Sequence, residues 1–350
     1  MIEPEVNPVV NKAIAATRSF LASADFSGAV RVTAAGEPVF EHAGGFANRA
    51  DRVPVEIDTR FGIASVTKTF TAVSICRLVD RGVVAFDTPV TEVLPPERRP
   101  TKMSPDVTVH HLLTHTSGIS DYYDEATLGA AAFGLLWDEI PTYSIRDPAD
   151  FLPMFKDLEP RAAPGGTDAT YCNAGYILLG LIVEQLSTTG YIDFVATEIF
   201  EPAGMHDSAF FALDGVNERV AVGYVATEDG GWKTNHYSIP IIGTSDGGAF
   251  STVGDLDRFL TALDTGMLME PATWGAMNHP HVGMEDFSYG YGLLIAETDR
   301  FRSFGHGGAD PGFSARAYRY PELDMNVTML GNSIEETDGV IAVFREALNR

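Results

Sequence analysis

Strand-like sequence is concentrated at the two ends of this 350-residue chain, and that distribution most restricts its fold. Residues 6–24 have helical spacing of apolar positions and lead into two short strand-like runs around an Ala-Gly-Glu-Pro turn. Near the other end, four closely spaced strand-like runs precede a helical pattern: "YGLLIAE", "RSFGHGG", "FSARAYRYPE" and "MNVTMLGN". Because so few strands are not stable in separate groups, we expect both ends to join into one antiparallel sheet flanked by the terminal helices.

The middle of the chain has a different pattern. Between residues 66 and 285 the apolar spacing is mostly helical, with interruptions by loops rich in Pro and Gly. The sequence therefore predicts an α+β protein. Residues 1–85 and 286–350 would form the sheet domain, and residues 86–285 would form a large, mainly helical inserted domain. We expect the active site at the interface between the two domains.

Composition limits the partners of the chain. It contains 48 Asp and Glu against 24 Lys and Arg, a net charge of −24. Such a surface repels phosphate backbones and anionic membranes, so we expect neither nucleic acid nor a membrane as partner. The longest apolar run, residues 176–183, is far shorter than the ~20 residues of a membrane-spanning helix, and the N-terminus has no signal-peptide pattern. With only Cys76 and Cys172, we expect a cytoplasmic protein with free thiols; the oligomeric state stays open.

A lysine interrupts the otherwise apolar stretch "FGIASVTKTFTAV", three residues after a serine. Residues 66–80 lack Gly and Pro and predict a buried helix with Ser65 at its N-terminus, where free N–H groups favour negative charge. Lys68 would lie one turn further on the same face, and burial lowers the pKa of a lysine toward a range in which it can activate a serine hydroxyl. A capping serine beside a lysine that reaches solvent gives the same Ser-x-x-Lys pattern, so this motif alone does not decide.

Two further motifs carry chemistry. Tyr171 and Asn173 form a Tyr-x-Asn pair before an apolar helix, where the phenol could act as a base and the amide could orient a substrate. His306, Gly307 and Gly308 end a strand-like run, and glycines there allow a substrate backbone to approach a strand edge. The histidine could donate a hydrogen bond into the pocket. Each motif also has an ordinary structural explanation. Tyr171 could be a core tyrosine and Asn173 a helix cap, and His306 could be a histidine in a turn.

In this order, the three motifs make the chain resemble the serine β-lactamase and penicillin-binding-protein superfamily. The similarity is strongest to its branch of class C β-lactamases, DD-peptidases and EstB-type esterases. The stretches "HHLLTHTSGI" and "SDGGAFSTVGDLDRFL" are also similar to that family, so the resemblance spans residues 25–335. It implies a split α/β sheet with an inserted helical domain, in agreement with the pattern described above.

The resemblance also implies roles for individual residues. Ser65 would be the acylated nucleophile, and Lys68 and Tyr171 would manage its proton. The remaining residues would bind substrate or build the oxyanion hole: Asn173, His306, Gly307, Gly308 and Ala309. The hole itself would use the backbone N–H groups of Ser65 and Ala309. No metal or other cofactor is implied.

One departure from the family pattern bears on substrate. β-Lactamases of the family usually have a lysine where this chain has His306, and a mostly neutral histidine holds a carboxylate less well than a lysine. We therefore expect a serine hydrolase for a small-molecule ester, amide or peptide, with carboxylesterase or D-amino-acid-type peptidase activity favoured. The alternatives are a β-lactamase or DD-carboxypeptidase, and a non-catalytic binder or sensor that is acylated without turnover.

Other motifs offer competing sites. "GTSDG" matches the Gly-x-Ser-x-Gly pattern around Ser245, but paired glycines follow where that pattern requires a helix. His111 and His115 have the i, i+4 spacing of zinc ligands, but a helix capped by Thr108 explains this segment better. Cys172 lies inside the second motif, and no histidine within thirty residues of it marks it as activated.

Overall fold

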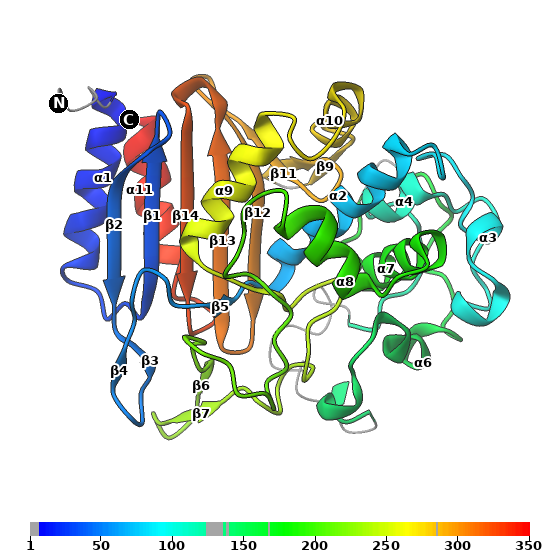
Figure 1. The fold of residues 1–350 in the computed structure, drawn as a ribbon, viewed down its shortest axis with the longest axis horizontal. Coiled ribbons are helices and arrows are strands. Elements are labelled where there is room, and N and C mark those ends of the chain that lie inside the picture. Colours follow the sequence, from blue (N-terminus) through cyan, green and yellow to red (C-terminus); the bar gives the residue numbers. More distant parts are fainter. Residues whose placement is uncertain (1–6, 124–135, 138–139, 167–168, 285) are drawn as a thin grey trace.

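The computed structural model describes residues 7–123, 136–137, 140–166, 169–284 and 286–350. Its main element is an eight-stranded antiparallel sheet with strand order β2-β1-β14-β13-β12-β11-β10-β9 (Figure 1). The strands are β1 (Gly28–Ala34), β2 (Glu37–Gly44), β9 (Val282–Met284), β10 (Phe287–Tyr289), β11 (Leu294–Glu297), β12 (Arg302–Asp310), β13 (Phe313–Tyr320) and β14 (Met325–Gly331). This sheet confirms the predicted α+β class.

The two ends of the chain meet at the pairing of β1 with β14. The strands run antiparallel in continuous register, from Gly28 opposite Gly331 to Ala34 opposite Met325. Every residue of β14 is buried, because helices cover both faces of the sheet at this strand. The joining of the terminal strand groups was predicted from the sequence, and the structure confirms it.

Alternate residues of the central strands enter two separate hydrophobic clusters, as expected for side chains that point to opposite faces of a sheet. Tyr318 and Val327 pack with the terminal helices α1 (Pro8–Leu21) and α11 (Asp338–Asn349). Ala317 and Leu330 belong to the larger cluster on the other face, which includes side chains of α9 (Val253–Asp264).

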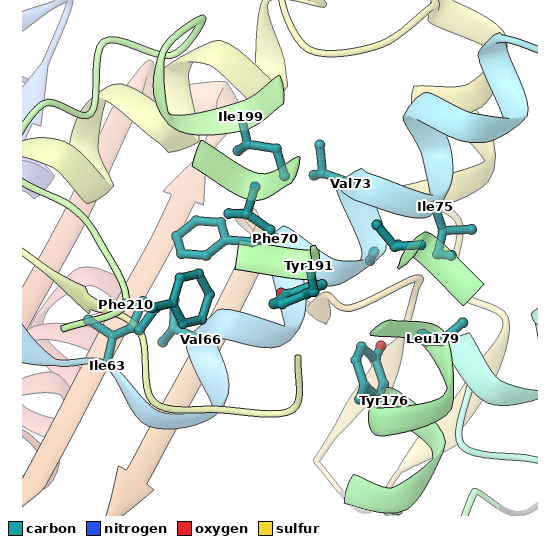
Figure 2. Packing of buried hydrophobic residues seen from close by; sticks show 14 of the residues in the cluster. Ile63, Val66, Phe70, Val73, Ile75, Tyr176, Leu179, Tyr191, Ile199 and Phe210 are labelled. Atoms are coloured by element: carbon teal, nitrogen blue, oxygen red, sulfur yellow. The ribbon is translucent and has the colours of Figure 1, made fainter. Parts of the chain in front are cut away.

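The larger cluster is built around two largely buried helices, α2 (Thr67–Asp80) and α7 (Asn173–Ser187). Figure 2 shows Phe70 and Val73 of α2 beside Ile199, with Tyr191 near the same helix. The ring of Phe70 also makes edge contacts with two other phenylalanine rings, which fixes the orientation of α2. The helix that follows Ser65 is therefore held from several sides.

The remaining elements are short. They are β3 (Phe46–Asn48), β4 (Val53–Pro54), β5 (Phe61–Gly62), β6 (Tyr224–Ala226), β7 (Trp232–Thr234), β8 (Phe250–Ser251), α3 (Val90–Val93), α4 (Val109–Leu113), α6 (Leu152–Phe155), α8 (Tyr191–Val195), α10 (Pro271–Met277), the 3₁₀ helices η1 (Ala64–Val66), η2 (Pro96–Arg98), η4 (Thr142–Ser144), η5 (Pro148–Phe151) and η7 (Pro321–Leu323), and the π-helix η6 (Ala196–Phe200). Among the described residues, no helix is both long and apolar enough to cross a membrane.

Two elements within the range predicted for the helical insertion belong to the sheet side of the molecule. Strand β9 pairs with β10 at the edge of the main sheet, and α9 packs against β1, β13 and β14. The division into residues 1–85 with 286–350 and residues 86–285 stays a prediction. These contacts show that the chain returns to the sheet before residue 286.

Candidate active site

Ser65 lies in η1, a single turn between the short strand β5 and helix α2. Hydrogen bonds from Ile63 N to Ala249 O (2.8 Å) and from Gly248 N to Ala64 O (3.3 Å) hold this turn. Ala64 has φ of 46°, a left-handed conformation that costs a non-glycine residue energy and persists only when the surroundings impose it. The backbone before Ser65 is therefore fixed by tertiary contacts.

Lys68 is fully buried and its ammonium faces Ser65. Its Nζ donates to Ser65 Oγ at 2.9 Å and to the backbone oxygen of Asp246 at 2.5 Å. The same Nζ lies 4.9 Å from the centre of the Tyr171 ring and 5.7 Å from that of Tyr176, so both aromatic faces help to offset its burial. The amine predicted from the sequence is in hydrogen-bond contact with the predicted nucleophile, as proton transfer between the two requires.

Tyr171 and Asn173 stand at the start of α7, and a distant carboxylate caps this helix. Asp121 accepts hydrogen bonds from the backbone N–H groups of Asn173 (2.6 Å) and Ala174 (3.0 Å). Burial raises the pKa of Asp121 to about 7, although these bonds and nearby Lys68 act in the opposite direction. The helix begins at Asn173 itself, and its capping group comes from a residue 52 positions earlier in the chain.

Ser65 lines two pockets whose charged residues have opposite signs. The first, here called the acidic pocket, contains Asp246 and Asp310 and no Lys, Arg or His among its described lining residues. Asn173 and several aromatic rings, including Trp137 and Phe211, complete it. The second, here called the basic pocket, is lined by Ser65, Tyr171, Phe287, Leu294, His306, Gly307, Gly308, Ala309, Arg316 and Tyr318, with no acidic residue among them.

The edge of β12 comes very close to the serine turn at Gly308. A Cβ atom on this glycine would lie 2.4 Å from Ile63 O and 2.8 Å from Ser65 N, so any side chain would force the strand away from the turn. Ala309 follows directly and lines the basic pocket with Ser65. The structure thus brings together the two residues that were predicted to supply the oxyanion hole.

His306 lines the basic pocket, but its ring nitrogens are engaged within the protein. Nδ1 donates to the carbonyl oxygen of Gly307, and Nε2 lies 3.0 Å from the hydroxyl of Tyr289. Burial, reinforced by the charge of Lys68, lowers the pKa of His306 to about 3, so the ring is neutral at pH 7. Instead of donating into the pocket, as the sequence suggested, the neutral imidazole accepts a hydrogen bond from Tyr289.

Sequence reasoning considered His115 only as a zinc ligand and missed the contacts that His115 and Asp246 make behind the site. His115 is buried with its ring 4.4 Å from that of Tyr171 and 4.6 Å from that of Tyr289, and its Nδ1 accepts from Cys172 N at 3.1 Å. Asp246 Oδ1 accepts from Thr244 at 2.7 Å, while its Oδ2 accepts from the Tyr122 hydroxyl. The available signal for His115 was its place in "HHLLTHTSGI", a stretch already matched to the family.

The competing motifs do not present reactive groups to the two pockets beside Ser65. Ser245 is fully buried, and its Oγ lies 2.2 Å from where a Cβ on Gly180 would be, so α7 covers it. Cys172 is buried as well, and burial next to Asp121 raises the pKa of its thiol well above the usual value. His111 Nδ1 accepts from the backbone N–H of Thr108 at 3.1 Å as part of a capping box, the helix-end role considered for it above.

The comparisons with known proteins agree with this architecture. The sequence profile of the beta-lactamase family matches residues 14–348. The chain is 30% identical over 340 residues to a penicillin-binding protein of Bacillus subtilis (strain 168), an alignment that covers 92% of this chain and 71% of that protein. A solved penicillin binding protein from Bacillus halodurans superposes with a TM-score of 0.88 at 39% identity, covering 94% of this chain and 99% of that one.

Hydrolases with other substrates are also similar to this chain. A D-aminopeptidase of Cereibacter sphaeroides (strain ATCC 17029 / ATH 2.4.9) is 28% identical over 309 residues, which cover 87% of this chain and 56% of that enzyme. The esterase EstB of Burkholderia gladioli is 36% identical over 205 residues, which cover 56% of this chain and 50% of that enzyme. The chain belongs to the beta-lactamase family of serine hydrolases, which confirms the resemblance inferred from its three motifs.

Proposed function

We propose that this chain hydrolyses small aminoacyl amides and esters through an acyl-enzyme on Ser65. The observation that carries the proposal is the hydrogen bond of 2.9 Å between a fully buried Lys68 amine and the Ser65 hydroxyl, at the junction of two pockets. A free serine hydroxyl is too weakly acidic to attack a carbonyl at neutral pH, so an adjacent base is required. Lys68 has the position of such a base.

In the proposed reaction, Ser65 Oγ attacks the substrate carbonyl and gives its single proton to the neutral amine of Lys68, which passes it on to Tyr171. The backbone N–H groups of Ser65 and Ala309 then stabilise the oxyanion, a contribution of about 3 kcal/mol for each donor. Tyr171 passes the proton to the leaving group, and water later releases the acyl group along the same path in reverse. The fixed serine turn and the close approach of Gly308 support this arrangement, because neither donor has to move.

The two pockets would bind different parts of the substrate. Tyr171 lines the basic pocket. Because the residue that protonates the leaving group must lie next to it, we place the leaving group in the basic pocket. The acyl group then enters the acidic pocket beside Asn173. Its aromatic lining suits an apolar side chain, while Asp246 and Asp310 favour an ammonium group and disfavour an anionic acyl group. An amino acid carries both an ammonium group and a side chain, and the D-aminopeptidase relative supports the D configuration.

The test is a substrate panel on one purified sample. It contains D- and L-phenylalanine p-nitroanilide, p-nitrophenyl butyrate and a chromogenic cephalosporin, each followed beyond one equivalent of product. We expect steady turnover with the D-aminoacyl anilide at the highest kcat/KM, because both anilides carry an ammonium group and an apolar side chain for the acidic pocket and the D-aminopeptidase relative supports the D configuration. A single burst without steady turnover for every compound would favour the acylated binder. If the butyrate ester is hydrolysed faster than the anilide, and by more than the difference in their intrinsic reactivity, the result would favour a simple carboxylesterase.

A further inference from the structure

We propose that His115 is a positioning residue, whose ring and backbone hold the hydroxyl of Tyr171 in place for proton transfer during the acylation of Ser65. This inference rests on the proposed function, because it concerns a step of the same reaction. His115 is not among the described lining residues of the two pockets beside Ser65, so it would act on the reaction only through Tyr171.

His115 has a backbone conformation that is uncommon for any residue except glycine. It follows the end of α4 with φ of 59°, in the left-handed region where many helices end on a glycine. A residue with a Cβ atom has a higher energy there and keeps this conformation only when the surrounding contacts impose it. A glycine would end the helix at a lower cost, so the reason for a histidine at this position lies in its side chain.

Two hydrogen bonds connect His115 to the segment that carries Tyr171. The backbone oxygen of His115 accepts from Thr170 N at 3.1 Å, and Nδ1 of its ring accepts from Cys172 N at 3.1 Å. The residues on both sides of Tyr171 are therefore fixed to one residue from a distant part of the chain. Residues 169–172 belong to no helix or strand, so these two bonds help to set the path of the backbone before α7 begins.

The ring of His115 lies among three tyrosine rings. Its centre is 4.4 Å from that of Tyr171, 4.6 Å from that of Tyr289 and 5.1 Å from that of Tyr176. The hydroxyls of the last two rings form hydrogen bonds of 3.0 Å to other buried groups, which fixes both rings. Of the three tyrosines, only Tyr171 is among the described lining residues of the pockets beside Ser65. The His115 ring therefore connects the proposed proton-transfer group to a layer of fixed rings behind it.

The protonation state of His115 suits this role. Because Nδ1 accepts a hydrogen bond from a backbone N–H group, the neutral ring carries its proton on Nε2. Nε2 is buried without a hydrogen-bond partner among the described residues, which costs stability, so packing alone would favour an apolar side chain here. Burial, reinforced by the charge of Lys68, holds the pKa of His115 well below its usual value. The ring is neutral at pH 7 and adds no second positive charge beside Lys68.

The experiment measures the acylation of Ser65 in His115→Asn, as the pre-steady-state release of the chromophore from the panel compound that reacts fastest with wild type. Asparagine tolerates the left-handed backbone and can keep the hydrogen bond to Cys172 N, but it lacks the ring. The rate of acylation should fall about tenfold, a part of the roughly 10²-fold that a positioned proton-transfer group supplies, while KM stays within about threefold of wild type. The control is His206→Asn, the same change at an exposed histidine, which should leave the rate unchanged.

A double-mutant cycle separates positioning of the hydroxyl from a general structural effect. In a Tyr171→Phe background no hydroxyl is left to position, so the addition of His115→Asn should change the rate of acylation by less than about twofold. Equal losses in the two backgrounds would overturn the inference, because they would show that His115 does not act through the hydroxyl. A wild-type rate in the single variant would overturn it as well.

Thermal unfolding checks that each variant is folded. If His115→Asn does not fold, the same cycle is run with His115→Phe, which keeps an aromatic ring and removes the acceptor for Cys172 N. The same outcomes then decide. If wild type reacts and the cycle shows no coupling, the role of His115 is lost and the proposed function is left intact. If wild type forms no acyl-enzyme with any compound of the panel, the proposed function itself is wrong, and the role of His115 is rejected with it.

Discussion

Two segments of this chain each present a serine among small residues, and only one of the two serines faces a pocket. Residues 61–68 hold Ser65, which lines both pockets and accepts a hydrogen bond from Lys68. Residues 243–249 hold Ser245, which is fully buried and whose Oγ has no hydrogen-bond partner among the described residues. The segments lie side by side because β5, at the start of the first segment, pairs with β8, which directly follows the second.

The second segment contributes backbone atoms to the site of the first. The carbonyl oxygen of Asp246 accepts from Lys68 Nζ at 2.5 Å, and that of Ser245 accepts from Thr71 Oγ1 at 2.5 Å. Both donors are side chains of α2, so this loop fixes the helix that carries the proposed base. The comparison shows that the local sequence around a serine does not determine whether the serine is reactive. The group that forms a hydrogen bond with its hydroxyl does.

Ser65→Ala gives the largest effect expected from this comparison. Turnover of the best aminoacyl substrate should fall by at least about 10⁴-fold, because the acyl-enzyme cannot form without the hydroxyl. Far-UV circular dichroism and thermal unfolding should remain those of wild type, since the hydroxyl adds little to packing. Activity retained in this variant would remove Ser65 from the mechanism.

Lys68→Met should lower kcat by about 10²- to 10⁴-fold, the range of a positioned proton-transfer group. Methionine keeps much of the buried stem and removes the amine, so the serine loses its hydrogen-bond partner. The matched control is Lys102→Met, which changes an exposed lysine paired with Glu159. Equal losses in both variants would show that the effect is not specific to the buried amine.

Tyr171→Phe should lower the rate of acylation by about 10²-fold or more, because the ring keeps its contact with Lys68 and loses only the hydroxyl. Pre-steady-state release of p-nitroaniline measures this step directly. Tyr237→Phe, at a site that is 82% exposed, is the control for loss of a phenol. A wild-type rate in Tyr171→Phe would assign the whole task of the base to Lys68.

Asp121 makes stability depend on pH. The pKa of its carboxyl group is about 7 in the folded chain and about 4 in the unfolded chain. Between about pH 4 and about pH 7 the folded chain therefore binds a proton on Asp121 that the unfolded chain does not. Its contribution to the free energy of unfolding should therefore decrease as pH rises from about 4 to 7, by roughly 2–4 kcal/mol, and level off above. Urea unfolding across this range should show a smaller decrease in Asp121→Asn. An identical pH dependence in the two proteins would contradict the raised pKa.

Ser245→Ala should have the smallest effect. The change removes a buried hydroxyl without a partner and leaves the backbone carbonyl in place, so stability should stay the same or rise by about 1 kcal/mol. The kcat should stay within about twofold of wild type. A fall as large as that of Ser65→Ala would show that the two serines had been assigned the wrong way round.

Elements with a strong local pattern were predictable from the sequence. The strand-like runs at both ends pair as expected, and the helix around Lys68 forms over nearly the predicted residues, beginning at Thr67 after the η1 turn. Strand β9 was not predicted, because its three residues are too short to show a period of two. It forms because β10 offers a partner edge, which is a tertiary cause.

For the site, the sequence located residues but not the contacts that hold them. Ser65, Lys68 and Tyr171 were selected because each lies in a motif with fixed spacing, and the structure brings them together. Asp121 and Tyr289 act on these motifs from segments far away in the chain, so no local spacing marks them. The orientation of His306 was also beyond prediction, since it depends on Tyr289.

The pairing of β1 with β14 has a consequence for how the protein is made. Strand β1 ends at Ala34 and its partner begins at Met325. At the usual rate of translation, roughly 15 to 60 seconds pass before the ribosome has produced the second strand. During that interval one edge of the nascent hairpin has no neighbour and is open to association with other chains, so a chaperone that covers residues 28–34 would serve this protein best while it is still being synthesised.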